Sequence, residues 1–215
     1  MHYTSVLFDL DGTLLDTLGD LTAAMNRTLT RHGLPERTRQ QMRAALGNGA
    51  RRLMELCVPA GTDGALFETL LAEYNADYAA HCRIETAPYP GVDALLRQLH
   101  AQGRKLAIVS NKPDEAVRAL RAEFFAGTIS IAVGEKTGIR RKPAPDTLLA
   151  AMAQLGADPA STVYVGDSEV DIATARAAGL PCISVLWGFR DRDLLEQAGA
   201  QQFAADAGEL ARLLD

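Results

Sequence analysis

The feature that most constrains the fold is an alternation of strand-like and helical patterns through the second half of the chain. Short apolar runs, typical of strands buried on both faces, alternate with longer segments whose apolar residues recur at helical spacing. The runs lie at residues 105–112, 129–134, 162–167 and 182–188, and two short helical segments are expected after the last one. This alternation predicts an α/β fold in which helices cover both faces of a parallel sheet.

The stretch TSVLFDLDGTLLDT, residues 4–17, adds a strand that ends in two carboxylates. The apolar run is followed by Asp9 and Asp11. Carboxylates are rarely buried unpaired, so both should lie at the carboxyl end of the strand, where open α/β sheets bind ligands. Two such oxygen ligands suit Mg²⁺ bound together with a substrate phosphate. Asp and Gly are also ordinary residues of surface turns, which is the alternative interpretation.

The strand pattern disappears between residues 18 and 83, where apolar residues recur at helical spacing. Glycine and proline punctuation predicts about four helices in this region. Two prolines, Pro88 and Pro90, indicate an extended stretch where the chain leaves it. We therefore expect an α/β core formed by residues 1–15 and 86–215, with a small all-helical cap formed by residues 16–85.

Four short segments carry a family resemblance, and they follow one another in the expected order. They are FDLDGTLLDT at residues 8–17, Ser110-Asn111-Lys112, Lys142 within RRKPAPD, and GDSEVD at residues 166–171. Each motif alone is weak, but four in order with suitable flanks are specific. Together they resemble the haloacid dehalogenase superfamily of aspartate-nucleophile phosphatases. The resemblance implies a Rossmann-like parallel-sheet core with a helical cap inserted after the first strand.

The resemblance also implies a role for each motif residue. Asp9 would be the nucleophile that forms an aspartyl-phosphate, and Asp11 would protonate the leaving group and then deprotonate water. Mg²⁺ would bind Asp9, the backbone carbonyl of Asp11, and Asp167. Ser110 and Lys142 would take part in catalysis. Phosphate or substrate contacts would come from the loop after the first strand and from the second and third motifs: Gly12, Thr13, Ser110, Asn111 and Lys142.

Asp171 lies four residues after Asp167, so the two carboxylates share one helix face if a helix begins there. Asp171 and Ser168 are expected to support the metal site from behind its direct ligands. The alternative for Asp171 is an acidic residue at a helix N-terminus, favoured by the helix dipole, and the sequence does not separate the two. Ser110 has a similar alternative as a helix N-cap.

The cap is expected to select the substrate, because a lid contacts the leaving group. Its turn at residues 46–50 resembles the substrate-side loop of phosphoglycolate phosphatases, so Asn48, Gly49 and Arg51 are candidate substrate contacts. An arginine fork there would bind a second anionic group, which favours a small anionic phosphomonoester such as 2-phosphoglycolate. Solvated arginines on an amphipathic helix are an equal alternative. A sugar phosphatase or a sugar phosphomutase remains open, whereas a non-catalytic binding protein is disfavoured because every catalytic position is filled.

Composition narrows the expected binding partners, cysteine chemistry and location of the protein. The 215 residues carry a formal net charge of −5, which gives no general reason to bind nucleic acid or membrane. Three scattered cysteines do not suggest a disulfide framework or a zinc site. No secretory signal and no long apolar run is visible. We expect a cytoplasmic monomer or homodimer that acts on a small phosphorylated metabolite.

Overall fold

The structure, a computed structural model, describes residues 3–215. The chain folds into two compact units. The core unit consists of the chain up to Asp16 together with Pro88–Asp215, and the helical unit is Thr17–Ala87. Two short strands, β2 (Leu15–Asp16) and β3 (Ala87–Pro88), pair where the chain passes from one unit to the other. Among the described residues, no helix is both long and apolar enough to span a membrane.

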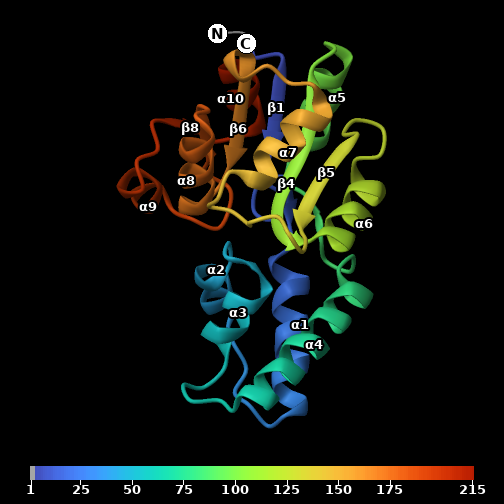
Figure 1. Cartoon of the computed structure of the whole chain (residues 1–215), viewed down its shortest axis with the longest axis vertical. Coiled ribbons are helices and arrows are strands. Elements are labelled where there is room, and N and C mark those ends of the chain that lie inside the picture. The colour runs from blue at the N-terminus through green and yellow to red at the C-terminus, as the bar shows by residue number, and fades with distance from the viewer. Residues whose placement is uncertain (1–2) are drawn as a thin grey trace. The chain divides into compact units, whose positions relative to one another are not determined.

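A six-stranded parallel sheet forms the centre of the core unit, with strand order β5-β4-β1-β6-β7-β8 (Figure 1). This confirms the expected α/β fold. The strands are β1 (Ser5–Phe8), β4 (Lys105–Pro113), β5 (Ile131–Glu135), β6 (Thr162–Gly166), β7 (Cys182–Val185) and β8 (Gln202–Ala204). The edge strand β8 was not expected, because three residues between two short helices are too few to show an alternating pattern.

The helices of the core unit follow the strands in the order that the sequence predicts. They are α5 (Val92–Ala101), α6 (Asp114–Phe124), α7 (Asp146–Leu155), α8 (Glu169–Ala178), α9 (Arg192–Gln197) and α10 (Ala207–Leu214), with a 3₁₀ turn at Pro159–Ser161. One face of the sheet packs Leu7 and Val109 against Leu148 of α7 and Ala175 of α8 in a continuous buried cluster. Pro113 ends β4 and occupies the N-cap position of α6.

The register of three neighbouring strands places the carboxyl ends of β1 and β6 level with each other, while β4 runs on beyond them to Pro113. Phe8, the last residue of β1, pairs with Ile108 of β4 on one side and with Val165 of β6 on the other. The ladder continues for one step, because Asp9 N–H donates to the carbonyl of Val165 at 2.9 Å. Residues that follow these strands therefore begin at the same edge of the sheet.

The helical unit contains α1 (Leu18–Arg31), α2 (Arg39–Ala45), α3 (Gly49–Cys57) and α4 (Gly64–His81). Thr38 caps α2 through a hydrogen bond from Gln41 N–H, and Asp63 caps α4. The first and last parts of the unit are joined by Asp20, a buried residue near the start of α1. Its carboxylate accepts hydrogen bonds of 2.8–3.0 Å from the backbone of residues 84–86 and from the hydroxyl of Thr86.

Candidate active site

The candidate site lies at the carboxyl edge of the sheet, within the core unit. Asp9 follows β1, Ser110 lies near the end of β4, and Asp167 follows β6. Lys142 comes from the loop before α7, and its ammonium lies 2.9 Å from Asp9 Oδ1 and 2.7 Å from Asp171 Oδ1. Residues from all four sequence motifs therefore meet in one cluster.

Lys142 is held at both its backbone and its side chain. The side-chain amide of Asn111 brackets the backbone of Lys142: Asn111 Nδ2 donates to its carbonyl at 3.0 Å, and Lys142 N–H donates to Asn111 Oδ1 at 2.8 Å. The Lys142 ammonium is 2% exposed. Burial alone would lower the pKa of Lys142, but the carboxylates of Asp171 and Asp9 outweigh it and raise the pKa, so the ammonium stays charged. The side chain of Asn111, expected to contact phosphate, fixes the backbone of Lys142 in the structure.

Asp171 sits in the first turn of α8 and is fully buried. Its Oδ2 accepts from Ser168 N–H at 3.1 Å and from the Ser168 hydroxyl at 2.6 Å. Its Oδ1 accepts from Lys142 at 2.7 Å and from the hydroxyl of Tyr164 at 3.0 Å. Asp171 is therefore an acidic residue at a helix N-terminus, and it also anchors the lysine beside Asp9, a role that the sequence did not suggest. Its expected support of a metal site stays a prediction.

Asp167 is fixed from two sides. Thr13 Oγ donates to Oδ1 at 3.0 Å, and Phe189 N–H donates to Oδ2 at 2.7 Å. Gly12 and Gly188 allow this close approach, since a Cβ on either one would lie 2.3–2.5 Å from atoms of Asp167 or its neighbours. The Thr13 hydroxyl, expected to contact phosphate, is directed to Asp167. Gly188 is not among the candidate residues that the sequence indicates, although a glycine at the end of a strand-like run is a usable signal of close backbone approach.

Asp11 has a lysine partner of its own. Its Oδ1 lies 2.9 Å from the ammonium of Lys112, whose side chain is 5% exposed. The pairing of Lys112 with Asp11 follows from the shared strand edge. Lys112 N–H also donates to Ser110 Oγ at 3.2 Å, which orients that hydroxyl at the end of β4.

The carboxylates of the site outnumber its ammonium groups by two: Asp9, Asp11, Asp167 and Asp171 face Lys112 and Lys142. Two of these buried carboxyl groups have raised pKa values. Burial raises the pKa of Asp9 well above its usual range even though Lys142 opposes it, and burial followed by the charge of Asp171 raises the pKa of Asp167 to about 7. A divalent cation would balance these charges.

The residues present fit a metal ion. Oxygens of Asp9, Asp167 and Asp171 lie within 4.8 Å of one another, and all three residues are buried. Asp9 Oδ1 is also buried and has no hydrogen-bond partner within the described part of the chain apart from its ion pair with Lys142. Each oxygen of Asp171 accepts two hydrogen bonds, whereas each oxygen of Asp167 accepts one, which makes Asp9 and Asp167 the carboxylates best placed to hold a cation.

The expected substrate contacts of the cap lie in the helical unit. Asn48 occupies the N-cap position of α3, Gly49 is the first residue of the helix, and Arg51 is the third. Arg51 already binds a carboxylate: its two terminal nitrogens lie 2.8 and 2.9 Å from the two oxygens of Glu68. This hydrogen bond lowers the pKa of Glu68. An incoming carboxylate would have to replace Glu68.

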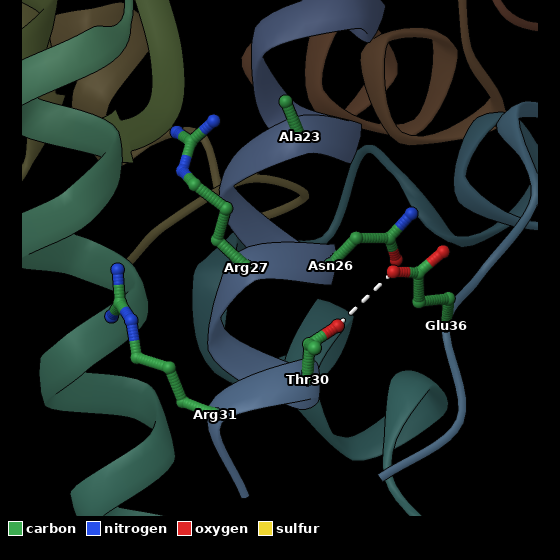
Figure 2. Close-up of a pocket in the computed structure, with 6 residues that line it drawn as sticks. All are labelled: Ala23, Asn26, Arg27, Thr30, Arg31 and Glu36. Carbon is green, nitrogen blue, oxygen red and sulfur yellow. Dashed lines mark hydrogen bonds between the residues drawn. The ribbon is translucent and has the colours of Figure 1, made fainter. Parts of the chain in front are cut away.

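A pocket of about 500 Å³ lies elsewhere in the helical unit, beside α1 (Figure 2). Its polar side chains are occupied by neighbours. Arg27 and Arg31 point toward α4, where both donate to Asp77, and Asn26 exchanges two hydrogen bonds with the backbone of Arg37. The pocket contains none of the residues that the sequence identifies as functional.

The fold and the geometry of this site are those of a haloacid dehalogenase-like hydrolase, and comparison with known proteins gives the same family. Residues 6–185 match the family of haloacid dehalogenase-like hydrolases, and the chain belongs to that family. It is 37% identical over 187 residues to a phosphoglycolate phosphatase of Xanthomonas campestris pv. campestris strain 8004, covering 86% of this chain and 84% of that protein. It is 32% identical over 217 residues to the N-acetylmuramic acid 6-phosphate phosphatase of Pseudomonas aeruginosa, covering 100% and 96%. A crystal structure from Lactobacillus delbrueckii subsp. bulgaricus superimposes with a TM-score of 0.94 at 36% identity, covering 100% and 99%.

Proposed function

We propose that the protein is a magnesium-dependent phosphomonoester hydrolase that works through an aspartyl-phosphate on Asp9. The observation that carries the proposal is the buried carboxylate of Asp9, paired with Lys142 and grouped with Asp167 within 4.8 Å. The Lys142 ammonium would orient a nucleophile in that position, and a metal ion would bind beside it, between Asp9 and Asp167. Relatives that are phosphatases support the same reaction.

In the first step, an oxygen of Asp9 attacks the phosphorus and the bond to the leaving alkoxide breaks, while the Asp11 carboxylic acid gives that alkoxide its proton. In the second step, a water attacks the phosphorus, Asp11 takes the proton of the water, and the bond to Asp9 breaks to release inorganic phosphate. Such acid–base assistance typically contributes about 10² to 10⁴ in rate. Lys112 holds Asp11 in place for both transfers.

Asp9, the backbone carbonyl of Asp11, and Asp167 would hold Mg²⁺, which would screen the repulsion between the nucleophile and a phosphate dianion. Ser110 would donate its hydroxyl to phosphate from the end of β4. Lys142 would orient Asp9 through their 2.9 Å ion pair.

For the substrate we propose a small anionic phosphomonoester, with 2-phosphoglycolate first. The support is the 37% identity to a phosphoglycolate phosphatase over most of both chains. Arg51, which follows the Gly-Asn-Gly turn, can bind a carboxylate in a bidentate manner, because it already binds Glu68 in this way.

A sugar phosphate is the second candidate. It is favoured by the relative that aligns along the whole chain, whose name gives N-acetylmuramic acid 6-phosphate as its substrate. A sugar phosphomutase would use the same core residues and would differ in requiring a sugar bisphosphate for turnover.

The test is turnover of a panel of phosphomonoesters that includes 2-phosphoglycolate, sugar phosphates and p-nitrophenyl phosphate, with Mg²⁺ and in excess chelator. We expect hydrolysis that requires the metal. Absence of hydrolysis across the panel, or full activity in chelator, contradicts the proposal. Arg51→Ala should lower the ratio of kcat/KM for 2-phosphoglycolate to that for p-nitrophenyl phosphate by roughly tenfold to hundredfold. The matched control is Arg52→Ala, which removes a neighbouring arginine paired with Glu55.

A further inference from the structure

Tyr164 carries a buried hydroxyl in the middle of a mostly apolar strand, and it lies directly behind the motif lysine. It occupies the middle of β6 and is fully buried. Its hydroxyl lies 3.0 Å from Lys142 Nζ, 3.0 Å from Asp171 Oδ1 and 3.2 Å from the carbonyl of Val109. The Tyr164 hydroxyl oxygen thus connects three segments: β4, the loop that carries Lys142, and the start of α8.

The hydrogen bonds of Lys142 can be assigned almost completely. An ammonium has three N–H groups and accepts nothing. Three oxygens lie within 3.0 Å of Nζ, one each from Asp9, Asp171 and Tyr164. The Tyr164 oxygen accepts from Lys142, and its own proton goes to Asp171 or to the Val109 carbonyl, both of which only accept. Each N–H of Lys142 therefore has an oxygen partner, and the ammonium is fixed in direction as well as in place.

The electrostatics support this assignment. Burial, together with the charges of Asp171 and Asp9, raises the pKa of Tyr164, so the phenol stays protonated and neutral. A neutral acceptor completes the shell of Lys142 without adding a further negative charge to a cluster that already has an excess of carboxylates. A phenylalanine of the same shape would leave one N–H of a buried ammonium without a partner, which is unfavourable in a low-dielectric interior.

We infer that Tyr164 is a positioning residue that holds the Lys142 ammonium against Asp9. It lies behind the lysine and reaches the reacting atoms only through it. The inference on turnover rests on the proposed phosphatase function, whereas the inference on the state of Lys142 does not depend on any activity.

The first test is the isosteric change Tyr164→Phe, with Tyr3→Phe as the matched control. Tyr3 is also buried but precedes β1, so it lies at the opposite edge of the sheet. We expect Tyr164→Phe to lower kcat roughly tenfold to hundredfold with little change in KM, because the lysine that orients the nucleophile is loosened while phosphate binding is retained. Tyr3→Phe should leave kcat unchanged. An unchanged kcat for Tyr164→Phe in an active enzyme overturns the inference.

A double-mutant cycle separates positioning from a general loss of stability. In a Lys142→Arg background, which keeps the charge but not the geometry, Tyr164→Phe should lower kcat by much less than it does alone. Equal fold losses in both backgrounds would show that Tyr164 acts independently of Lys142, against the inference.

A measurement without substrate distinguishes failure of this inference from failure of the proposed function. Buried, hydrogen-bonded lysine ammonium groups exchange protons slowly and give ¹H–¹⁵N signals. We expect such a signal for Lys142, identified by its absence in Lys142→Arg, and we expect it to be lost in Tyr164→Phe but retained in Tyr3→Phe. Retention of the same signal in Tyr164→Phe overturns the inference, whether or not the wild-type protein hydrolyses any phosphomonoester.

Discussion

Replacing Asp171 by asparagine should destabilise the core unit strongly, although the two side chains have nearly the same shape. Each oxygen of Asp171 faces a group that cannot accept a hydrogen bond: Lys142 Nζ at Oδ1 and Ser168 N–H at Oδ2. The amide nitrogen of asparagine would place donor against donor in either orientation. No flip of the side chain removes the conflict.

The size of the effect follows from burial and from the remaining partners. Removing one partner of a buried ion pair typically costs about 3–5 kcal/mol, and Lys142 keeps Asp9, so we expect about 2–4 kcal/mol. For a chain of this size that corresponds to a fall in Tm of roughly 5–15 °C. Thermal unfolding followed by circular dichroism measures it.

The matched control is Asp93→Asn, the same change in the first turn of α5, where Asp93 forms an exposed pair with Arg97. There the loss should be below about 1 kcal/mol. A Tm of Asp171→Asn within a degree of that of the wild type would refute the reasoning, because it would mean that the four hydrogen bonds to the carboxylate contribute little.

Three further expectations concern the site. Asp9→Asn should abolish turnover while the protein stays folded, and retention of a tenth of wild-type activity would exclude Asp9 as the nucleophile. Lys112→Met should lower kcat/KM about tenfold for alkyl phosphates and less for p-nitrophenyl phosphate, whose leaving group needs little proton donation; equal losses for both would argue against a role through Asp11. In chelator, Tm should fall as the pH rises from about 4 to about 7, because burial, followed by Asp171, raises the pKa of Asp167 to about 7, so the folded state binds the proton more tightly than the unfolded state. Asp167→Asn should flatten that slope, and a Tm that rises over this range would contradict the assigned direction.

The convergence of distant motifs could be predicted from the sequence because it depends on topology alone. Asp9 and Asp167 each follow a strand of one parallel sheet and Ser110 lies in the last half of another, and parallel strands bring their carboxyl ends to a single edge. The four longer helices of the core, α5 to α8, could be located from the sequence because their apolar spacing is regular over ten or more residues.

The partners of these residues could not be predicted in the same way, because a hydrogen bond depends on side-chain positions from several segments. Tyr164 looks like an apolar strand residue, although a buried hydroxyl always needs partners, and that rule was the available signal. Nothing in the sequence context of Lys112 indicates that its side chain would meet Asp11. Residue pairs such as Arg51 with Glu68 depend on how α3 packs on α4.

The clamp formed by Asp20 has a consequence for how such a chain can diversify. One carboxylate ties the beginning of the helical unit to residues 84–86, so the two ends of that unit are held together by its own atoms. An inserted segment whose ends meet adds little closure entropy to its host. The strands on either side of the insertion, β1 and β4, pair directly with each other in the sheet. A module of this kind can be exchanged, lengthened or transplanted between hosts while the register of the catalytic sheet stays the same.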